Sequence, residues 1–142
     1  MNNLRSKLNS YYITAVLGVV FAIVGFSYNA WRMEVTEDNS NIRTAAFSVL
    51  SELAELEQII YAAHYDQDPV AGSPRKGWVK IGLISDLSML ISEPVSLAAE
   101  RLKSIWSYHW EDIPNDIEAT DKTIAEIDKV RAEIKLTLKS LD

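Results

Sequence analysis

The residues able to do metal or nucleophilic chemistry are few and scattered along the chain. There is no cysteine, which excludes thiolate catalysis, iron–sulfur ligation and cysteine-bound zinc. The only histidines are His64 and His109. Di-metal sites in helical bundles use a Glu-x-x-His motif. Tyr61 and Trp106 stand three residues before the two histidines, so that motif is missing.

The carboxylates form no recognisable catalytic set either. Asp66-x-Asp68 resembles the start of a calcium loop but lacks the later ligands and the closing glutamate. Glu52 and Glu55 form a pair of the kind found on ordinary solvated helix surfaces. No glycine-rich phosphate loop and no nucleophile elbow is present. We therefore expect a protein without enzymatic activity, bound metal or cofactor.

The elements that carry these residues begin with an apolar segment at residues 11–31, YYITAVLGVVFAIVGFSYNAW. It is uncharged, and a helix of about 20 residues covers the roughly 30 Å hydrocarbon core of a bilayer. A single transmembrane helix is predicted. The alternative is a cleavable secretion signal, with Gly25-Phe26-Ser27 supplying the small residues near the cleavage site. Aromatic residues at both ends of the segment are typical of interfacial belts and favour a retained anchor.

Charge asymmetry predicts the orientation of this helix. The tail at residues 1–10 carries Arg5, Lys7 and no acidic residue, whereas acidic residues follow the span. Because positive residues stay on the cytoplasmic side, residues 32–142 are expected outside the cytoplasm. In a bacterial cell this would be a single-pass inner-membrane protein with a periplasmic domain. The absence of cysteine is compatible with that compartment.

Small residues follow one face of the predicted span. Thr14, Gly18, Ala22 and Gly25 are spaced i, i+4, i+8 and i+11, which places them on one side of a helix. Such a face lets another helix approach closely, so it predicts contact with a membrane-protein partner or with a second copy of the chain. The alternative is that these residues simply face lipid.

The part of the chain beyond the span is acidic. It holds 12 basic and 20 acidic residues, a net charge of −8 for residues 31–142. A surface of that sign repels phosphate groups, so nucleic acid and broad electrostatic contact with anionic lipid are disfavoured.

Hydrophobic periodicity predicts helices over most of this part. Residues 42–63 and 117–141 each carry an apolar seam at alternating steps of three and four. Residues 78–110 keep helical spacing with one shift of register at Pro94, where the helix is either kinked or divided. Loops are expected at residues 66–77 and 113–116. The predicted fold is all-α: an up-down antiparallel bundle of three long helices, or four segments if the middle helix is split.

This topology predicts where the loops lie. The loop at residues 66–77 would form a tip distal to the membrane. The middle helix would then return and bring Trp106, Tyr108 and Trp110 close to the outer headgroups. The alternative is that these aromatics close one end of the core. His64 and His109 would lie at opposite ends, too far apart to share a metal.

The tip mixes charges of both signs with aromatic residues. Its candidate contact residues are Tyr65, Asp66, Asp68, Arg75, Lys76 and Trp78. This composition suits a partner protein or a small polar ligand. The alternative is a solvated loop whose tryptophan packs into the core.

One polar residue, Asp86, interrupts the most apolar stretch of the middle helix. It could form a buried ion pair with Arg43 or Arg131, or it could lie exposed on the helix surface.

Three functions are compatible with these features. The first is a non-enzymatic accessory subunit that docks on another membrane or envelope protein. The second is a membrane-anchored sensor or small-ligand-binding bundle, which is weakened by the lack of a second span or output domain. The third is a mechanical role through coiled-coil self-association, against which the wide apolar face and internal turns argue.

Overall fold

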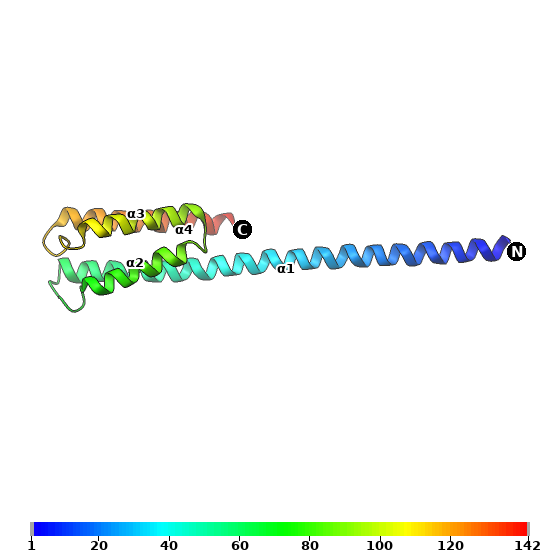
Figure 1. Cartoon of the computed structure of the whole chain (residues 1–142), viewed down its shortest axis with the longest axis horizontal. Helices are drawn as coiled ribbons and strands as arrows, with labels where there is room; N and C mark the ends of the chain where they lie inside the picture. Colours follow the sequence, from blue (N-terminus) through cyan, green and yellow to red (C-terminus); the bar gives the residue numbers. More distant parts are fainter. Residues whose placement is uncertain (1, 142) are drawn as a thin grey trace. The chain divides into compact units, whose positions relative to one another are not determined.

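The chain folds into α-helices and turns. The computed structural model describes residues 2–141, with side chains described from residue 11 onward, and contains no strand among them (Figure 1). The helices are α1 (Asn2–His64), α2 (Pro74–Ser88), α3 (Glu93–His109) and α4 (Ile117–Ser140). The prediction of an all-helical fold is therefore confirmed for these residues. Contacts divide the chain into two units, one up to Asp38 and one from Asn39 onward.

The first unit is a single stretch of α1. By length and composition, α1 contains a segment apolar enough to cross a membrane, near the N-terminus. The predicted cytoplasmic tail at residues 1–10, with Arg5 and Lys7, lies outside the residues whose side chains are described.

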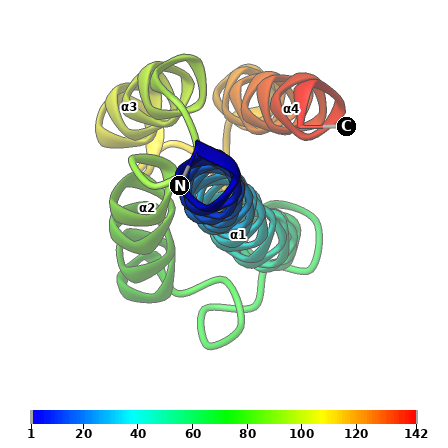
Figure 2. The same cartoon turned by 90° about the vertical axis from the view of Figure 1, so that its right-hand side faces the viewer.

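The second unit is a bundle made from the later part of α1 together with α2, α3 and α4. Seen end-on in Figure 2, α2 lies beside α1, α3 beside α2, and α4 beside α3. The seam predicted for residues 42–63 faces the core, since Val49, Leu53 and Ile60 are fully buried. In α4, Ile127 and Ile134 are equally buried, whereas Ile117 is 50% exposed because it occupies the first position of the helix.

The middle segment is divided rather than kinked. α2 ends at Ser88, and α3 begins at Glu93 with Pro94 in its first turn, where its missing N–H costs no helical hydrogen bond. Ser92 is the N-cap residue in an extended conformation, and its hydroxyl lies 3.0 Å from that of Thr137 instead of capping the helix. Of the two alternatives at Pro94, the divided helix is the correct one.

The first predicted loop differs from the observed one in its bounds, and the second agrees at its end. The first loop is shorter than the expected 66–77, because Pro74 begins α2 at its first position and the next three residues are helical. The second turn ends as expected at Asp116, whose side chain accepts a hydrogen bond from the Glu118 N–H and caps α4.

The division of the middle segment overturns the predicted position of Trp106, Tyr108 and Trp110. Because α3 runs back against α2, its last turn returns to the first turn of α2. The rings of Trp78 and Trp106 meet edge-on with centroids 6.3 Å apart. These aromatics therefore lie at the same end of the second unit as the first loop, and not at the opposite end.

Burial of the three aromatics follows from this position. Trp106 is 2% exposed and belongs to the core, and Trp110 packs partly buried against it. Tyr108 is 78% exposed. The alternative that the tryptophans close one end of the core is the one that the structure supports.

Candidate functional site

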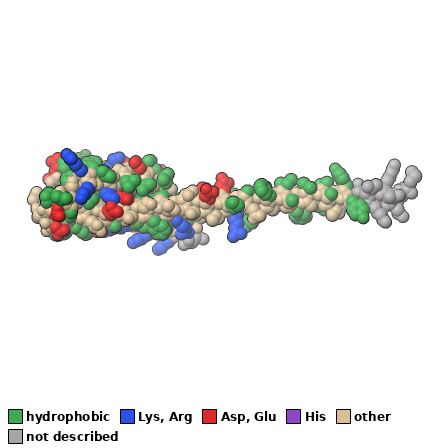
Figure 3. Space-filling model, turned by 90° about the horizontal axis from the view of Figure 1, so that it is seen from below, with side chains coloured by type: hydrophobic (Ala, Val, Ile, Leu, Met, Phe, Trp, Pro, Cys, Tyr) green, Lys and Arg blue, Asp and Glu red, His purple; other side chains and the backbone are tan. Residues whose placement is uncertain are grey.

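The first candidate site is the apolar surface of residues 11–31. Its large side chains are exposed along the whole segment, from Tyr11 at 74% to Phe26 at 77%, because no other element of the first unit covers them. Figure 3 shows uncharged, largely apolar side chains along this part of α1, with charged ones beyond it. Near its C-terminal end the rings of Tyr28 and Trp31 lie 6.2 Å apart. The segment thus presents a continuous apolar surface with aromatic ends.

The small-residue face of this segment is sterically open. A methyl group added at Gly18 or Gly25 would meet no heavy atom within 4 Å. Thr14 and Ala22 are exposed on the same helix. The predicted helix contact through this face stays a prediction.

The second candidate site lies at the end of the second unit where α1 stops, here called the loop end. It comprises residues 61–78 and 106–116. The His64 ring donates from Nδ1 to the carbonyl of Ile113 at 2.8 Å. Gln67 has a positive φ of 51° and donates through Nε2 to the carbonyls of His64 and Pro114, both at 2.7 Å. These bonds join the two loops and hold a backbone conformation that is costly for a residue with a side chain.

The expectation that His64 and His109 lie at opposite ends is therefore wrong. His109 ends α3 at the loop end, and its carbonyl accepts from the N–H of Ile113, the same residue that His64 contacts. The error has the same cause as that for Trp106: the division at Pro94 adds one reversal of direction.

Asp68 supports the loop itself. Its Oδ1 accepts hydrogen bonds from the N–H groups of Val70 at 2.8 Å and Ala71 at 2.9 Å. The Ala71 and Val70 N–H groups hold the pKa of Asp68 below its ordinary value. The loop then passes so close to α1 that a Cβ on Gly72 would lie 2.5 Å from the Cα of Ala63. Only glycine fits there.

The predicted tip residues have separate roles. Tyr65 and Asp66 are exposed at the end of α1, and the Tyr65 ring meets that of His64 edge-on at 4.7 Å. Arg75 and Lys76 are exposed on the first turn of α2, and Trp78 is 39% exposed against Trp106. Sequence reasoning did not identify Gln67, because its role depends on the loop at Pro114.

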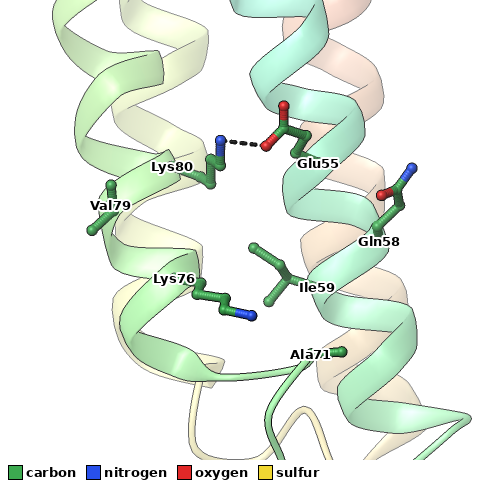
Figure 4. Close-up of a pocket in the computed structure, with 7 residues that line it drawn as sticks. All are labelled: Glu55, Gln58, Ile59, Ala71, Lys76, Val79 and Lys80. Atoms are coloured by element: carbon green, nitrogen blue, oxygen red, sulfur yellow. Dashed lines mark ion pairs between the residues drawn. The ribbon is translucent and has the colours of Figure 1, made fainter. Parts of the chain in front are cut away.

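A groove of about 600 Å³ lies between α1 and α2 next to this loop. It is lined by Glu55, Gln58, Ile59, Ala71, Lys76, Val79 and Lys80. In Figure 4, Lys76 and Lys80 extend from α2 toward α1, while Glu55 and Ile59 extend back toward α2. The volume is within the range of small-molecule sites, about 300–1,000 Å³.

Ion pairs cross the groove at one end. Lys80 Nζ lies 2.7 Å from a carboxylate oxygen of Glu52 and 2.5 Å from one of Glu55. The Glu52 and Glu55 carboxylates raise the pKa of the Lys80 ammonium above its ordinary value. From the sequence alone these glutamates are predicted to be a solvated pair, because nothing in the sequence indicates which residues of α2 lie opposite them on α1.

Of the two alternatives for Asp86, the structure supports exposure on the helix surface and not a buried pair with Arg131. Asp86 is exposed on α2, and Arg131 of α4 instead pairs with Glu57 of α1 and with Asp128, at 3.1 Å. Arg43, the other proposed partner, is partly buried on α1. The hydrogen bond from Arg131 is the largest cause that lowers the pKa of Glu57, and the hydroxyl of Tyr61 donates to the same carboxylate.

The described residues include no group of three or more His, Asp or Glu side chains able to hold a metal ion. Comparisons with models of protein families, with curated proteins and with solved structures found no match to the chain.

Proposed function

We propose that the chain is a non-enzymatic, single-pass membrane protein that docks on another membrane or envelope protein as an accessory subunit. The observation that carries this proposal is the exposed apolar surface of residues 11–31. Burying such a surface in water-free surroundings is favourable by about 25 cal/mol per Å². Lipid or a neighbouring helix would provide those surroundings, and the aromatic ends suit headgroup depth.

Arg5 and Lys7 before the span support a cytoplasmic N-terminus and an extracytoplasmic, periplasmic bundle. The cysteine-free chain makes this easy to test, because an introduced cysteine is the only reactive thiol. With a membrane-impermeant maleimide, we expect Asp66→Cys to be labelled in cells with a permeabilised outer membrane. Asn3→Cys should be labelled only after the inner membrane is broken. The reverse pattern would refute the orientation.

Docking through the small-residue face is tested within the membrane. Leucine at Gly18 and Ala22 fills the open face and should abolish association in a membrane reporter assay. The matched control places leucine at Val16 and Val20, on the opposite side of the helix, and should leave association unchanged. Equal association for both double variants would remove this face as the contact.

The partner is sought with the full-length chain in a mild detergent, followed by mass spectrometry. The expected result is one stoichiometric membrane protein that is captured by the chain with unchanged Gly18 and Ala22 and lost with the leucine variant. Capture of a second copy alone would indicate a homo-oligomer instead of an accessory subunit.

A second candidate function is a membrane-anchored bundle that binds a small ligand. The groove between α1 and α2 favours it, because the groove has the volume of a small-molecule site and carries charged groups at its edges.

A further inference from the structure

The groove between α1 and α2 carries a positively charged group at the end nearest the first loop. Lys76 is exposed on the first turn of α2 and extends toward α1 (Figure 4). Among the ion pairs of the described residues none involves Lys76. The Asp68 carboxylate is near enough for the charge of Lys76 to help lower its pKa, but it forms no ion pair with Lys76, and its Oδ1 accepts from the backbone of its own loop. The Lys76 ammonium is therefore free to meet an anion from solution.

The other end of the groove carries a net negative charge. Glu52 and Glu55 together hold two negative charges against the single positive charge of Lys80. The Glu55 side chain is 51% exposed and lines the groove, so an incoming cation can reach its carboxylate.

Apolar surface separates these two charged ends. Ile59 is 8% exposed and lines the groove together with Ala71 and Val79. Lys76 and Lys80 are four residues apart on α2, and such a step is one helical turn of about 5–6 Å. In Figure 4 the Lys76 ammonium points away from Lys80, so a ligand that matches both ends needs opposite charges separated by at least about that distance, with an aliphatic part between them.

We infer that this groove binds a small zwitterion in which an anionic group and an ammonium are separated by a short aliphatic chain, as in ω-amino acids. The anion meets Lys76, and the ammonium meets the exposed carboxylate of Glu55. An α-amino acid fits poorly because one carbon atom carries both of its charged groups. This inference develops the second candidate function and rests on the groove alone, so its failure leaves the docking proposal unaffected.

Calorimetric titration of the full-length chain in an uncharged maltoside detergent tests the inference. The probe is 5-aminovalerate, compared with pentanoate, pentylamine and glycine. Only the first has both charges at the required separation, so it should bind most tightly. Equal affinity for 5-aminovalerate and pentanoate would overturn the inference, because the negative end would then contribute nothing.

Free zwitterions and lipid headgroups share this chemistry, and glycerophosphoethanolamine separates the two sources, because its phosphodiester carries one negative charge like the carboxylate of 5-aminovalerate. Tighter binding of glycerophosphoethanolamine than of 5-aminovalerate would support a headgroup-derived ligand. The opposite order would support a free amino acid.

Two variants assign the ends of the ligand. Lys76→Ala should weaken the binding of 5-aminovalerate and of pentanoate about fivefold, which is the upper value for one exposed ion pair. It should leave the affinity for pentylamine unchanged. In Glu55→Gln the remaining charges of Glu52 and Lys80 cancel, so this end of the groove has no net charge. The variant should therefore bind 5-aminovalerate and pentylamine more weakly, but not pentanoate.

Lys103→Ala on α3 is the matched control, since it makes the same change in net charge away from the groove. It should alter none of these affinities. Both Lys76 and Glu55 are exposed, so unchanged far-UV circular dichroism is expected for all variants. An unchanged affinity of Lys76→Ala for 5-aminovalerate would overturn the inference.

Discussion

Two glycines of α2 provide a matched test of the divided middle segment. Gly77 faces the core, where an added Cβ would come under 3.0 Å from the Cζ2 and Cη2 atoms of Trp106. At Gly82 an added Cβ would meet nothing within 4 Å. Alanine at either position gains about 1 kcal/mol of helix propensity. The difference between the two variants therefore isolates the packing against Trp106.

The structure gives a magnitude for that difference. Trp106 is 2% exposed, so its ring is enclosed by the core and cannot move out into solvent without displacing neighbouring side chains. Overpacking of this kind costs about 1–3 kcal/mol. Gly82→Ala should raise the free energy of unfolding by about 1 kcal/mol. The free energy of unfolding of Gly77→Ala should be about 2 kcal/mol lower than that of Gly82→Ala. For a domain of about 100 residues this is a difference of roughly 8–16 °C in Tm.

Thermal unfolding of the full-length chain, followed by far-UV circular dichroism, measures both variants. Trp106→Phe removes the ring atoms that the new Cβ would meet. It also removes an indole N–H that is buried without a hydrogen-bond partner among the described residues. Gly77→Ala should therefore cost at least about 1 kcal/mol less in that background. If Gly77→Ala raises Tm as much as Gly82→Ala, or if its cost is unchanged by Trp106→Phe, α3 does not fold back on α2.

Three further outcomes follow from individual contacts. Glu57→Gln should lower the free energy of unfolding by about 1 kcal/mol at neutral pH. The folded-state pKa of Glu57 lies below the ordinary 4.5, so the stability that its ionised carboxylate contributes is fully present above pH 4.5 and is lost as the pH falls through the folded-state pKa. If urea unfolding shows that Glu57→Gln destabilises the protein as much near pH 3 as at neutral pH, this reasoning is contradicted. Asp116→Ala should cost about 1 kcal/mol in thermal unfolding by removing the N-cap of α4, whereas Asp116→Asn keeps an acceptor and should cost little. Gly72→Ala should displace the first loop from Ala63, and faster limited proteolysis within residues 65–73 than in the unchanged chain would show it.

The parts of the fold that depend on local periodicity could be predicted from the sequence. Leu53 and Leu56 repeat at helical spacing on α1, and both are fully buried as that spacing requires. The turn into α4 was equally predictable, because Pro114 and the capping Asp116 are local signals.

The division of the middle segment could not be settled in this way. Apolar residues keep helical spacing on both sides of Pro94, so periodicity is the same for a kink and for a reversal. The connecting turn contains Met89 and Leu90, which are 67% and 64% exposed and carry no turn signal of their own. The choice depends on whether α3 packs against α2, which is a tertiary contact.

Contacts across helices were missed for the same reason. Arg131 interrupts the seam of its own helix, and the sequence offers several acidic partners for it. Glu57 becomes the partner only once α4 is packed antiparallel to α1, as the hydrogen bond from Asn39 to the carbonyl of Leu141 at 3.4 Å also indicates. Lys80 likewise meets Glu52 only in the observed register of α2.

The number of reversals decides which exposed residues share a surface. With three helices, Tyr65 and Tyr108 would lie at opposite ends of the bundle. With four segments, α1 and α3 both stop at the loop end, and these two tyrosines, 61% and 78% exposed, lie there together. The bond between His64 and Ile113 ties the two loops of this end to each other. The exposed turn at Met89 and Leu90 lies at the other end of the second unit, where α2 stops. A substitution there thus tests a different surface from one at either tyrosine.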